Sequence, residues 1–160
     1  MNKKNNWQEF KNIIEEKGVK KLYHFTDRDN LESIIKNGGL YSWADCDEKG
    51  IAIAKPGGEG LSRSLDARGG LQHYVRVGFV KKHPMMYAAM NEQRISNPVI
   101  LEIDPEVIWW QDSLYCNKNV TRNDASYGSS VEHLKQIHFD TVLKNRYFDL
   151  AEDCLLYTSD

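Results

Sequence analysis

One histidine stands out among the residues that could do chemistry, because of what surrounds it. The stretch "KKLYHFTDRDNLESIIKNGGLYS" spans residues 20–42 and places His24 between two aromatic residues, directly before a short predicted helix. A histidine in that position can hold a ligand through a ring nitrogen. It can also be a packed residue with internal hydrogen bonds, which is the commoner situation at the end of a strand. The residue alone leaves both interpretations open.

The other polar residues that could serve a site are spread over the chain. No G-x-x-x-x-G-K-[ST] phosphate loop and no G-x-S-x-G serine elbow occurs in the sequence. His133 and His138 are five residues apart, so they do not share a helix face, and no carboxylate spacing completes a zinc site. Hydrolases and metalloenzymes are therefore not favoured. The polar set that remains comprises Thr26, Asn30, residues 38–41, the arginines at 63 and 68, and Glu152.

The spacing of apolar residues predicts the elements that must position these side chains. Apolar residues at helical intervals predict a helix over residues 5–17. They also predict a second helix that Thr26 or Asp27 caps and Gly38 ends, with Leu31, Ile34 and Ile35 on its apolar face. The predicted strands are residues 19–25, 74–80, 99–104 and 151–157, and a further short helix covers 131–137. Strands dominate after the two N-terminal helices, which is an α+β pattern.

Length and composition favour one globular domain over residues 1–160. Hydrophobic residues make up 41% and charged residues 28% of the chain, both near the globular average. No apolar run is long enough to cross a membrane and the N-terminus is not signal-like, so we expect a cytoplasmic protein. The three cysteines are far apart, which indicates neither a disulfide framework nor a zinc ribbon.

Positive charge is concentrated between Lys55 and Lys82, although the net charge of the whole chain is −2. That stretch holds six basic residues against two acidic ones. Such a local excess can attract phosphate groups. A solvated basic face without a partner is an equally good interpretation of the same residues.

Five segments in a fixed order resemble the DarT-type ADP-ribosyltransferase toxins, NAD-dependent enzymes that modify nucleobases in DNA. "LYHFTDRDNLESIIKNGGLYS" resembles the opening segment of that family and "GGLQHYVRVGFVKKHPMMYA" its next block. "NPVILEID" is similar to its following strand, "NKNVT" to an Asn-Ala-Ala stretch, and "AEDCLLY" to a Gln-Ala-Glu strand. The resemblance covers nearly the whole chain. It implies an α+β, ADP-ribosyltransferase-like fold with two small packed β-sheets, N-terminal helices and an NAD cleft.

The same resemblance implies roles for individual residues. The residues implied for NAD binding are His24, Thr26, Asn30, Gly39, Leu40 and Tyr74. Glu152 would be the catalytic glutamate, and Arg63 or else Arg68 the arginine of the catalytic site. The arginine-rich stretch that the family has before its Tyr-Val strand is thinner here, so the choice between the two arginines stays open.

These residue types suit the implied reaction. Breaking the bond between nicotinamide and ribose leaves a cation-like sugar, which a carboxylate such as that of Glu152 stabilises. The same carboxylate can accept the proton of the attacking base nitrogen. An arginine can pair with the pyrophosphate or fix the acceptor base with its planar fork. NAD is consumed as a substrate, and no metal is expected.

The acceptor implied by the resemblance is an unpaired or flipped base of single-stranded DNA, held along the basic stretch from residue 55 to residue 82. Two alternatives stay open: the same chemistry on RNA or protein, and a non-catalytic NAD- or nucleic-acid-binding module of the same fold. A bacterial toxin or phage-defence effector of this kind also implies a macrodomain-type antitoxin as partner.

Overall fold

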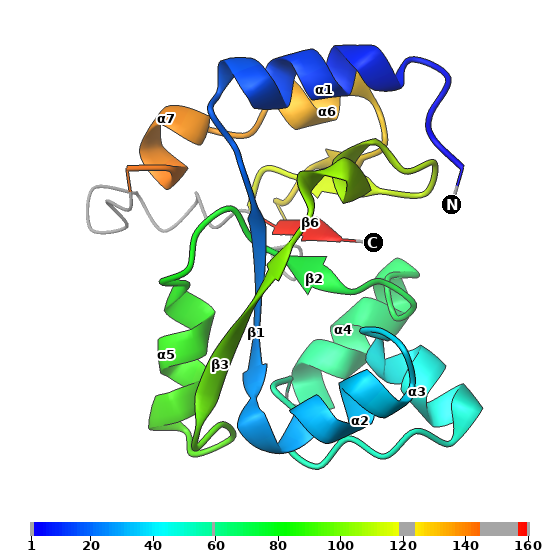
Figure 1. Cartoon of the computed structure of the whole chain (residues 1–160), viewed down its shortest axis with the longest axis vertical. Coiled ribbons are helices and arrows are strands. Elements are labelled where there is room, and N and C mark those ends of the chain that lie inside the picture. The colour runs from blue at the N-terminus through cyan, green and yellow to red at the C-terminus, as the bar shows by residue number, and fades with distance from the viewer. Residues whose placement is uncertain (1, 59, 119–123, 145–156, 160) are drawn as a thin grey trace. The chain divides into compact units, whose positions relative to one another are not determined.

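The computed structural model of this chain describes residues 2–58, 60–118, 124–144 and 157–159 (Figure 1). Its helices are α1 (Trp7–Glu16), α2 (Leu31–Lys36), α3 (Trp43–Lys49), α4 (Gly60–Gly69), α5 (Pro84–Asn91), α6 (Val131–Lys135) and α7 (Phe139–Val142). The strands are β1 (Leu22–Asp27), β2 (Arg76–Val77), β3 (Pro98–Ile103), β4 (Leu114–Cys116), β5 (Tyr127–Gly128) and β6 (Tyr157–Ser159). Two 3-10 turns complete them, η1 (Arg28–Asn30) and η2 (Pro105–Trp109).

Contacts between residues divide the chain into two compact units. Unit 1 combines the described parts of 1–24, 76–82 and 102–160, and unit 2 combines those of 25–75 and 83–101. β1 and β3 each contribute residues to both units, so neither unit is one continuous piece of chain. The expectation that residues 1–160 act as a single domain stays a prediction.

Two small sheets run through the described residues, as the resemblance implied. β1 pairs with β3, while β2, β6, β4 and β5 form an antiparallel sheet in that order within unit 1. Tyr115 of β4 lies opposite Thr158 of β6 on one side and Gly128 of β5 on the other. β6 is the last described strand in the sequence, yet it occupies an interior position between β2 and β4.

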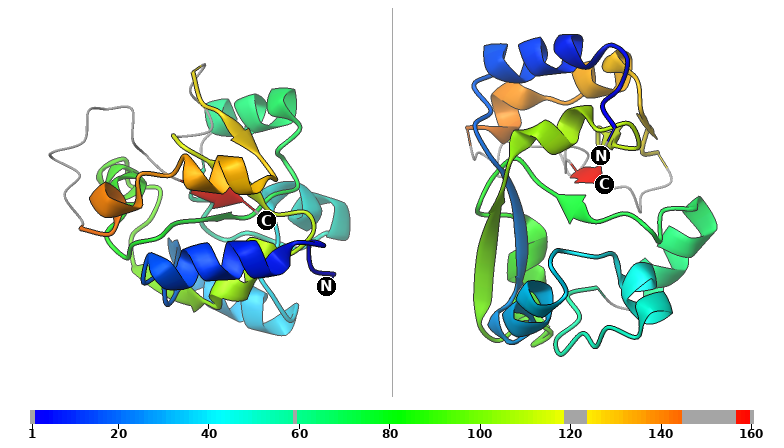
Figure 2. Two further views of the ribbon diagram at one scale, coloured as in Figure 1. Left: turned by 90° about the horizontal axis from the view of Figure 1, so that it is seen from above. Right: turned by 45° about the vertical axis from the view of Figure 1, so that its right-hand side comes forward.

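Helix α1 forms where apolar residues repeat at helical spacing, and it closes the core of unit 1. Phe10 and Ile14 are each 1% exposed. The Phe10 ring packs on Tyr115 of β4, with ring centroids 5.4 Å apart. Helix α6 contributes the fully buried Leu134 and contacts both α1 and β4 (Figure 2). These contacts join the two helices to the four-stranded sheet.

The core of unit 2 comes from its helices and the loops between them. Its buried apolar residues are Ala44, Cys46, Leu71, Met86, Ala89 and Ile95. Helix α5 begins at Pro84, whose fixed φ suits the first helical turn, and the His83 ring accepts the Met85 N–H at 3.2 Å as its cap. Phe25 of β1 stacks on that ring with centroids 6.0 Å apart, so α5 is anchored to the end of β1.

The first two helices and the strand at 98–103 agree with the sequence patterns, but the prediction that strands dominate afterwards is wrong. Helices α3, α4 and α5 follow instead. α3 is short and buries only the small Ala44 and Cys46, and α4 is rich in serine, glycine and charge, so neither shows an apolar stripe.

Two further predictions need correction. The strand predicted over 74–80 shrinks to β2 and a single bridge between Tyr23 and Gly78. Ile35, predicted on the buried face of the second helix, is 77% exposed. The final predicted strand, 151–157, lies outside the described residues except for Tyr157, where β6 begins.

Candidate active site

His24 lies in β1, and a hydrogen bond from its ring helps to fix its orientation. Its Nδ1 lies 2.7 Å from the carbonyl oxygen of Arg76. A carbonyl oxygen only accepts hydrogen bonds, so Nδ1 carries the proton and donates it. Burial lowers the pKa of His24, and the bond to Arg76 opposes that effect only in part. The imidazole is therefore neutral at pH 7, with Nε2 as its acceptor nitrogen.

Thr26 and Asn30 lie together at the end of β1 and are both buried, at 8% and 7% exposure. The Asn30 amide donates to the Thr26 hydroxyl oxygen at 3.0 Å and to the carbonyl oxygen of Lys55 at 2.7 Å. Its own oxygen accepts the Lys55 backbone N–H at 2.9 Å. Asn30 thus joins β1 to the glycine- and proline-containing loop that leads into α4. These bonds favour a positioning role, and contact of Asn30 with NAD stays a prediction.

The buried carboxylate of Asp27 stabilises the turn that ends at Asn30. Asp27 is fully buried and accepts backbone N–H groups from Asp29 at 3.0 Å, Ser96 at 2.7 Å and Asn97 at 3.0 Å. These bonds, the one from Asp29 foremost, lower the pKa of Asp27. The Asp29 bond caps η1, the turn that ends at Asn30. The sequence analysis predicted Asp27 only as a possible cap of the second helix. Its bonds to residues 96 and 97 form through tertiary folding, so no local sequence pattern predicts them.

The double glycine turns the chain between α2 and α3. Gly38 has φ of +74°, a left-handed conformation that favours glycine, and it ends α2 as predicted. The Gly39 N–H bonds the carbonyl oxygen of Ile34 at 3.1 Å. Gly39 and Leu40 are half-buried, and Ser42 then caps α3 by accepting the Asp45 N–H at 3.1 Å. The Gly39–Leu40 backbone is thus held between two helix ends.

The two candidate arginines differ in their surroundings. Arg63 is half-buried near the start of α4, and its guanidinium carbon lies 5.2 Å from the centre of the Trp43 ring in α3. This distance is that of a cation–π contact. Arg68 is exposed near the end of α4. The structure therefore gives Arg63 the more defined position, and its catalytic role stays a prediction.

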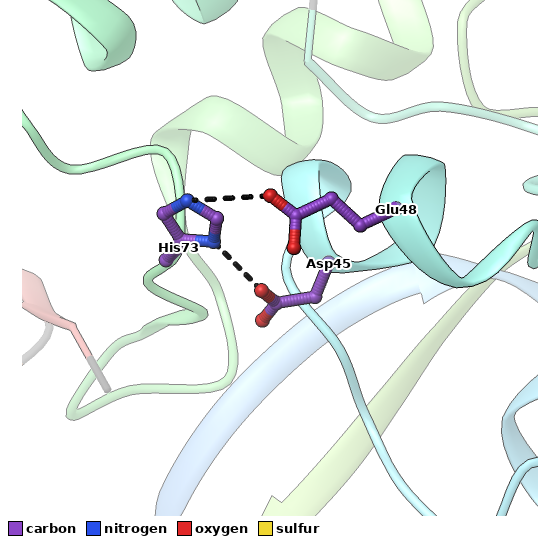
Figure 3. Close-up of side chains that lie close together, drawn as sticks. All are labelled: Asp45, Glu48 and His73. Atoms are coloured by element: carbon purple, nitrogen blue, oxygen red, sulfur yellow. Dashed lines mark hydrogen bonds and ion pairs between the residues drawn. The ribbon is translucent and has the colours of Figure 1, made fainter.

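Three charged residues that the sequence analysis did not single out form a cluster in unit 2. His73 Nδ1 lies 2.7 Å from Asp45 Oδ1, and His73 Nε2 lies 3.8 Å from Glu48 Oε1 (Figure 3). The hydrogen bond to Asp45 raises the pKa of His73, and the same bond lowers the pKa of Asp45. The sequence pattern that could have indicated the cluster is the i, i+3 spacing of Asp45 and Glu48, which places both carboxylates on one side of a helix.

This cluster is better described as an ion-pair cluster than as a metal site. One ligand atom from each residue lies within 4.8 Å of the others, a separation that a metal ion could bridge. The two carboxylates, however, face different nitrogens of the ring (Figure 3). A metal ion would bind one ring nitrogen and would leave the carboxylate at the other nitrogen without a share in the site.

The remaining predicted residues are only partly placed. Tyr74 is half-buried, and its N–H bonds the carbonyl oxygen of Leu71 at 3.1 Å. Glu152 lies outside the described residues. His24 belongs to unit 1, and the NAD-binding residues predicted at 26, 30, 39, 40 and 74 belong to unit 2 together with Arg63. Within unit 2 the structure brings Thr26 and Asn30 into direct contact.

A family model described as DarT, ssDNA thymidine ADP-ribosyltransferase, matches residues 23–156. The chain belongs to the DarT family. The match begins one residue before His24 and includes every residue predicted for the site. The family and the NAD-dependent ADP-ribosyltransferase class expected from the sequence are thereby confirmed.

A solved structure supports the DarT fold independently. Thermus sp. 2.9 DarT in complex with carba-NAD+ matches this chain with a TM-score of 0.59 at 16% sequence identity. The match covers 88% of this chain and 74% of the Thermus chain. At that identity the likeness shows the fold, which is the expected ADP-ribosyltransferase fold. No curated protein matches the chain. None of the helices in the described ranges combines the length and the apolar character that crossing a bilayer requires.

Proposed function

We propose that this chain transfers ADP-ribose from NAD to thymidine in single-stranded DNA. The observation that carries the proposal is the DarT family match over residues 23–156, because it spans the His24 segment and Glu152 alike. The fold shared with a DarT that was solved with carba-NAD+ supports NAD as the donor. The lack of a Rossmann fingerprint in the sequence agrees with NAD consumed as a substrate instead of serving as a hydride carrier.

We assign NAD binding to the residues that the family resemblance implied. The neutral His24 ring would accept a ribose hydroxyl at Nε2, because its Nδ1 proton is already given to the Arg76 carbonyl. The Thr26 oxygen accepts from Asn30, so its own proton would be donated to the ligand. The Gly39–Leu40 backbone and the Tyr74 ring would line the nicotinamide side. Asn30 would act by fixing Thr26 and Lys55.

Glu152 and Arg63 would carry the chemistry. The bond between nicotinamide and ribose breaks, and nicotinamide leaves with the bond's electron pair. Glu152 would stabilise the positive charge on the sugar and then accept the proton that the thymine ring nitrogen gives up as it bonds to the ribose carbon. Arg63 would pair with the pyrophosphate or fix the thymine. The reaction is balanced without a metal or a redox partner.

The acceptor would be an unpaired thymine. In a duplex, the ring N–H of thymine is paired with adenine, so the nitrogen that must react is out of reach. The basic stretch divides between the units, with residues 55, 63 and 68 in unit 2 and residues 76, 81 and 82 in unit 1. Lys81 is bound to Glu102 at 2.7 Å, whereas Lys82 is exposed and suited to a DNA phosphate. A cytoplasmic toxin of this kind would have a macrodomain-type hydrolase as its antitoxin.

The proposal is tested by mass spectrometry on synthetic oligonucleotides. The protein is incubated with NAD and single strands that contain or lack thymidine, with the matching duplex and with an RNA of the same sequence. We expect a mass gain of one ADP-ribose on thymidine-containing single strands alone. Modification of RNA, of protein or of strands without thymidine would contradict the proposal, and so would NAD binding without transfer.

Variants of the two arginines decide which one serves the site. We expect Arg63→Ala to lower the transfer rate far more than Arg68→Ala, because the Arg63 guanidinium is held against Trp43 while Arg68 is exposed. The two residues share α4, so a general disturbance of that helix would affect both variants alike. A larger loss in Arg68→Ala would assign the catalytic arginine to position 68.

A further inference from the structure

Helix α3 connects two groups of contacts on its opposite sides. At 100° per residue, Asp45 and Glu48 lie within about 60° of each other around the helix and well away from Trp43. The Trp43 side faces Arg63 of α4. The other side faces His73 in the segment before β2 (Figure 3). A movement of α3 relative to His73 would therefore carry the Trp43 ring with it.

The buried face of α3 carries small side chains and a half-buried tryptophan. The helix has seven residues, a length that is marginal without tertiary contacts. Ser42 caps its beginning, Gly50 with φ of +65° ends it, and the buried side chains it contributes are the small Ala44 and Cys46. Caps define where a helix begins and ends without fixing its rotation. The ion-pair cluster with His73 therefore acts together with the burial of Ala44 and Cys46 in setting the rotation of α3.

The Trp43 ring in turn limits the freedom of Arg63. An arginine side chain has many rotamers, and ordering it for each reaction cycle carries an entropic cost. A tryptophan ring within cation–π distance restricts the guanidinium to the space over the ring face. Arg63 is then presented in one orientation before substrate arrives, which is the condition for a preorganised charge.

We propose that Trp43 is a positioning residue for Arg63, and that the ion-pair cluster of Asp45, Glu48 and His73 holds Trp43 in place. The inference rests on the proposed function, in which Arg63 serves the site. The Trp43 ring orients the Arg63 guanidinium, and the cluster orients α3 and thereby the Trp43 ring. The charged groups that the structure sets against His73 are Asp45 and Glu48, and Lys49 lies near enough to affect Asp45.

The arrangement is tested first by a measurement that needs no activity. Protons on the Arg63 side chain that lie over the Trp43 ring have NMR signals shifted upfield by the ring current. We expect that shift to disappear in Trp43→Leu and to shrink in His73→Leu and Glu48→Gln. The matched control is His138→Leu, which removes an exposed histidine of unit 1 and should leave the shift unchanged. A shift that persists in both cluster variants would overturn the role of the cluster.

Transfer kinetics test the consequence. We expect Trp43→Leu to lower kcat about tenfold, as misplacement of a catalytic group does, and Trp43→Phe to recover most of the loss because phenylalanine keeps an aromatic face. In an Arg63→Lys background, Trp43→Leu should cost nothing more, because lysine lacks the planar fork. Equal losses of kcat on Trp43→Leu in the wild-type and Arg63→Lys backgrounds would show that Trp43 does not act through Arg63.

The pH dependence of kcat distinguishes a positioning role of His73 from a merely structural one. As pH rises through the pKa of His73, the ring loses the proton that lets both nitrogens donate, so we expect the wild-type kcat to fall. That fall should be missing in His73→Leu and present in His138→Leu. If the wild-type protein modifies no oligonucleotide, the proposed function fails while the NMR result still decides the positioning. If transfer proceeds and none of these variants changes kcat, the positioning fails alone.

Discussion

The side chain of Asn30 and the backbone of Lys55 form a reciprocal pair of hydrogen bonds. The Asn30 amide donates to the Lys55 carbonyl oxygen at 2.7 Å, and the Lys55 N–H donates to the Asn30 oxygen at 2.9 Å. A side-chain amide thus pairs with a loop residue as a neighbouring strand would. The second amide hydrogen of Asn30 goes to Thr26. One residue therefore sets the distance between the proposed NAD-binding threonine and the loop that leads to Arg63.

We expect Asn30→Ala to weaken NAD binding severalfold and to lower the Tm by about 5 °C, because it leaves part-buried backbone groups of Lys55 without their side-chain partner. Isothermal titration with NAD and thermal melts measure the two effects. Asn37→Ala is the matched control, since Asn37 is exposed and its side chain bonds Ser33 in the same helix region. Unchanged NAD affinity in Asn30→Ala would show that the loop does not need this tether.

Asp27→Asn should lower the Tm at pH 7, because an amide nitrogen cannot accept the N–H groups that the carboxylate binds. The folded-state pKa of Asp27 is depressed, so its stabilisation is present above the unfolded pKa and disappears as pH falls through the folded pKa. The Tm difference between the wild type and the variant should therefore begin to shrink as pH falls below about 4 and disappear once pH is below the folded-state pKa. Melts from pH 7 to pH 3 measure this. Asp29→Asn, an exposed neighbour, is the control.

The stability of the His73 cluster should have the opposite dependence on pH. The folded-state pKa of His73 is raised, so its stabilisation is fully present below the unfolded pKa of about 6.5 and is lost as pH rises through the folded pKa. We expect the Tm difference between the wild type and His73→Leu to shrink between pH 6 and pH 9. The difference should be small, since the side chain is 45% exposed and solvent screens the pair. A gap that widens with pH would contradict this sign.

Glu152→Ala should abolish ADP-ribosyl transfer and leave the Tm and the affinity for NAD nearly unchanged. The reason is that the carboxylate is proposed to act on charge that develops only in the transition state. Single-turnover transfer to a thymidine-containing oligonucleotide measures the loss, and Glu152→Gln tests whether the charge itself is needed. Transfer at the wild-type rate in either variant would remove Glu152 from the catalytic role.

The sequence predicted what local patterns determine. Spacing and composition predicted the apolar face of α1, the end of α2 at Gly38 and the strand after residue 97. The order of five segments led to the DarT family, which the family match confirmed. The hydrogen bonds of Asp27 could not be predicted in this way, because its partners at residues 96 and 97 lie far along the chain and are ordinary backbone groups.

Helices α3 and α5 and the His73 cluster were missed for a related physical reason. α3 buries only the small Ala44 and Cys46, and its side chains also contact Arg63 and His73. α5 depends on a proline start and on a histidine cap that also stacks with Phe25. In both helices tertiary contacts outweigh intrinsic propensity, which spacing alone cannot reveal.

The interior place of β6 in the four-stranded sheet bears on how the protein is made. β6 separates β2 from β4, so β2 has no strand partner, and β4 has only β5, until residues 157–159 have left the ribosome. Pairings so distant in sequence form late and slowly. A chain interrupted during synthesis would lack the central strand of this sheet. We therefore expect ADP-ribosyl transfer only from chains that include residues 157–159.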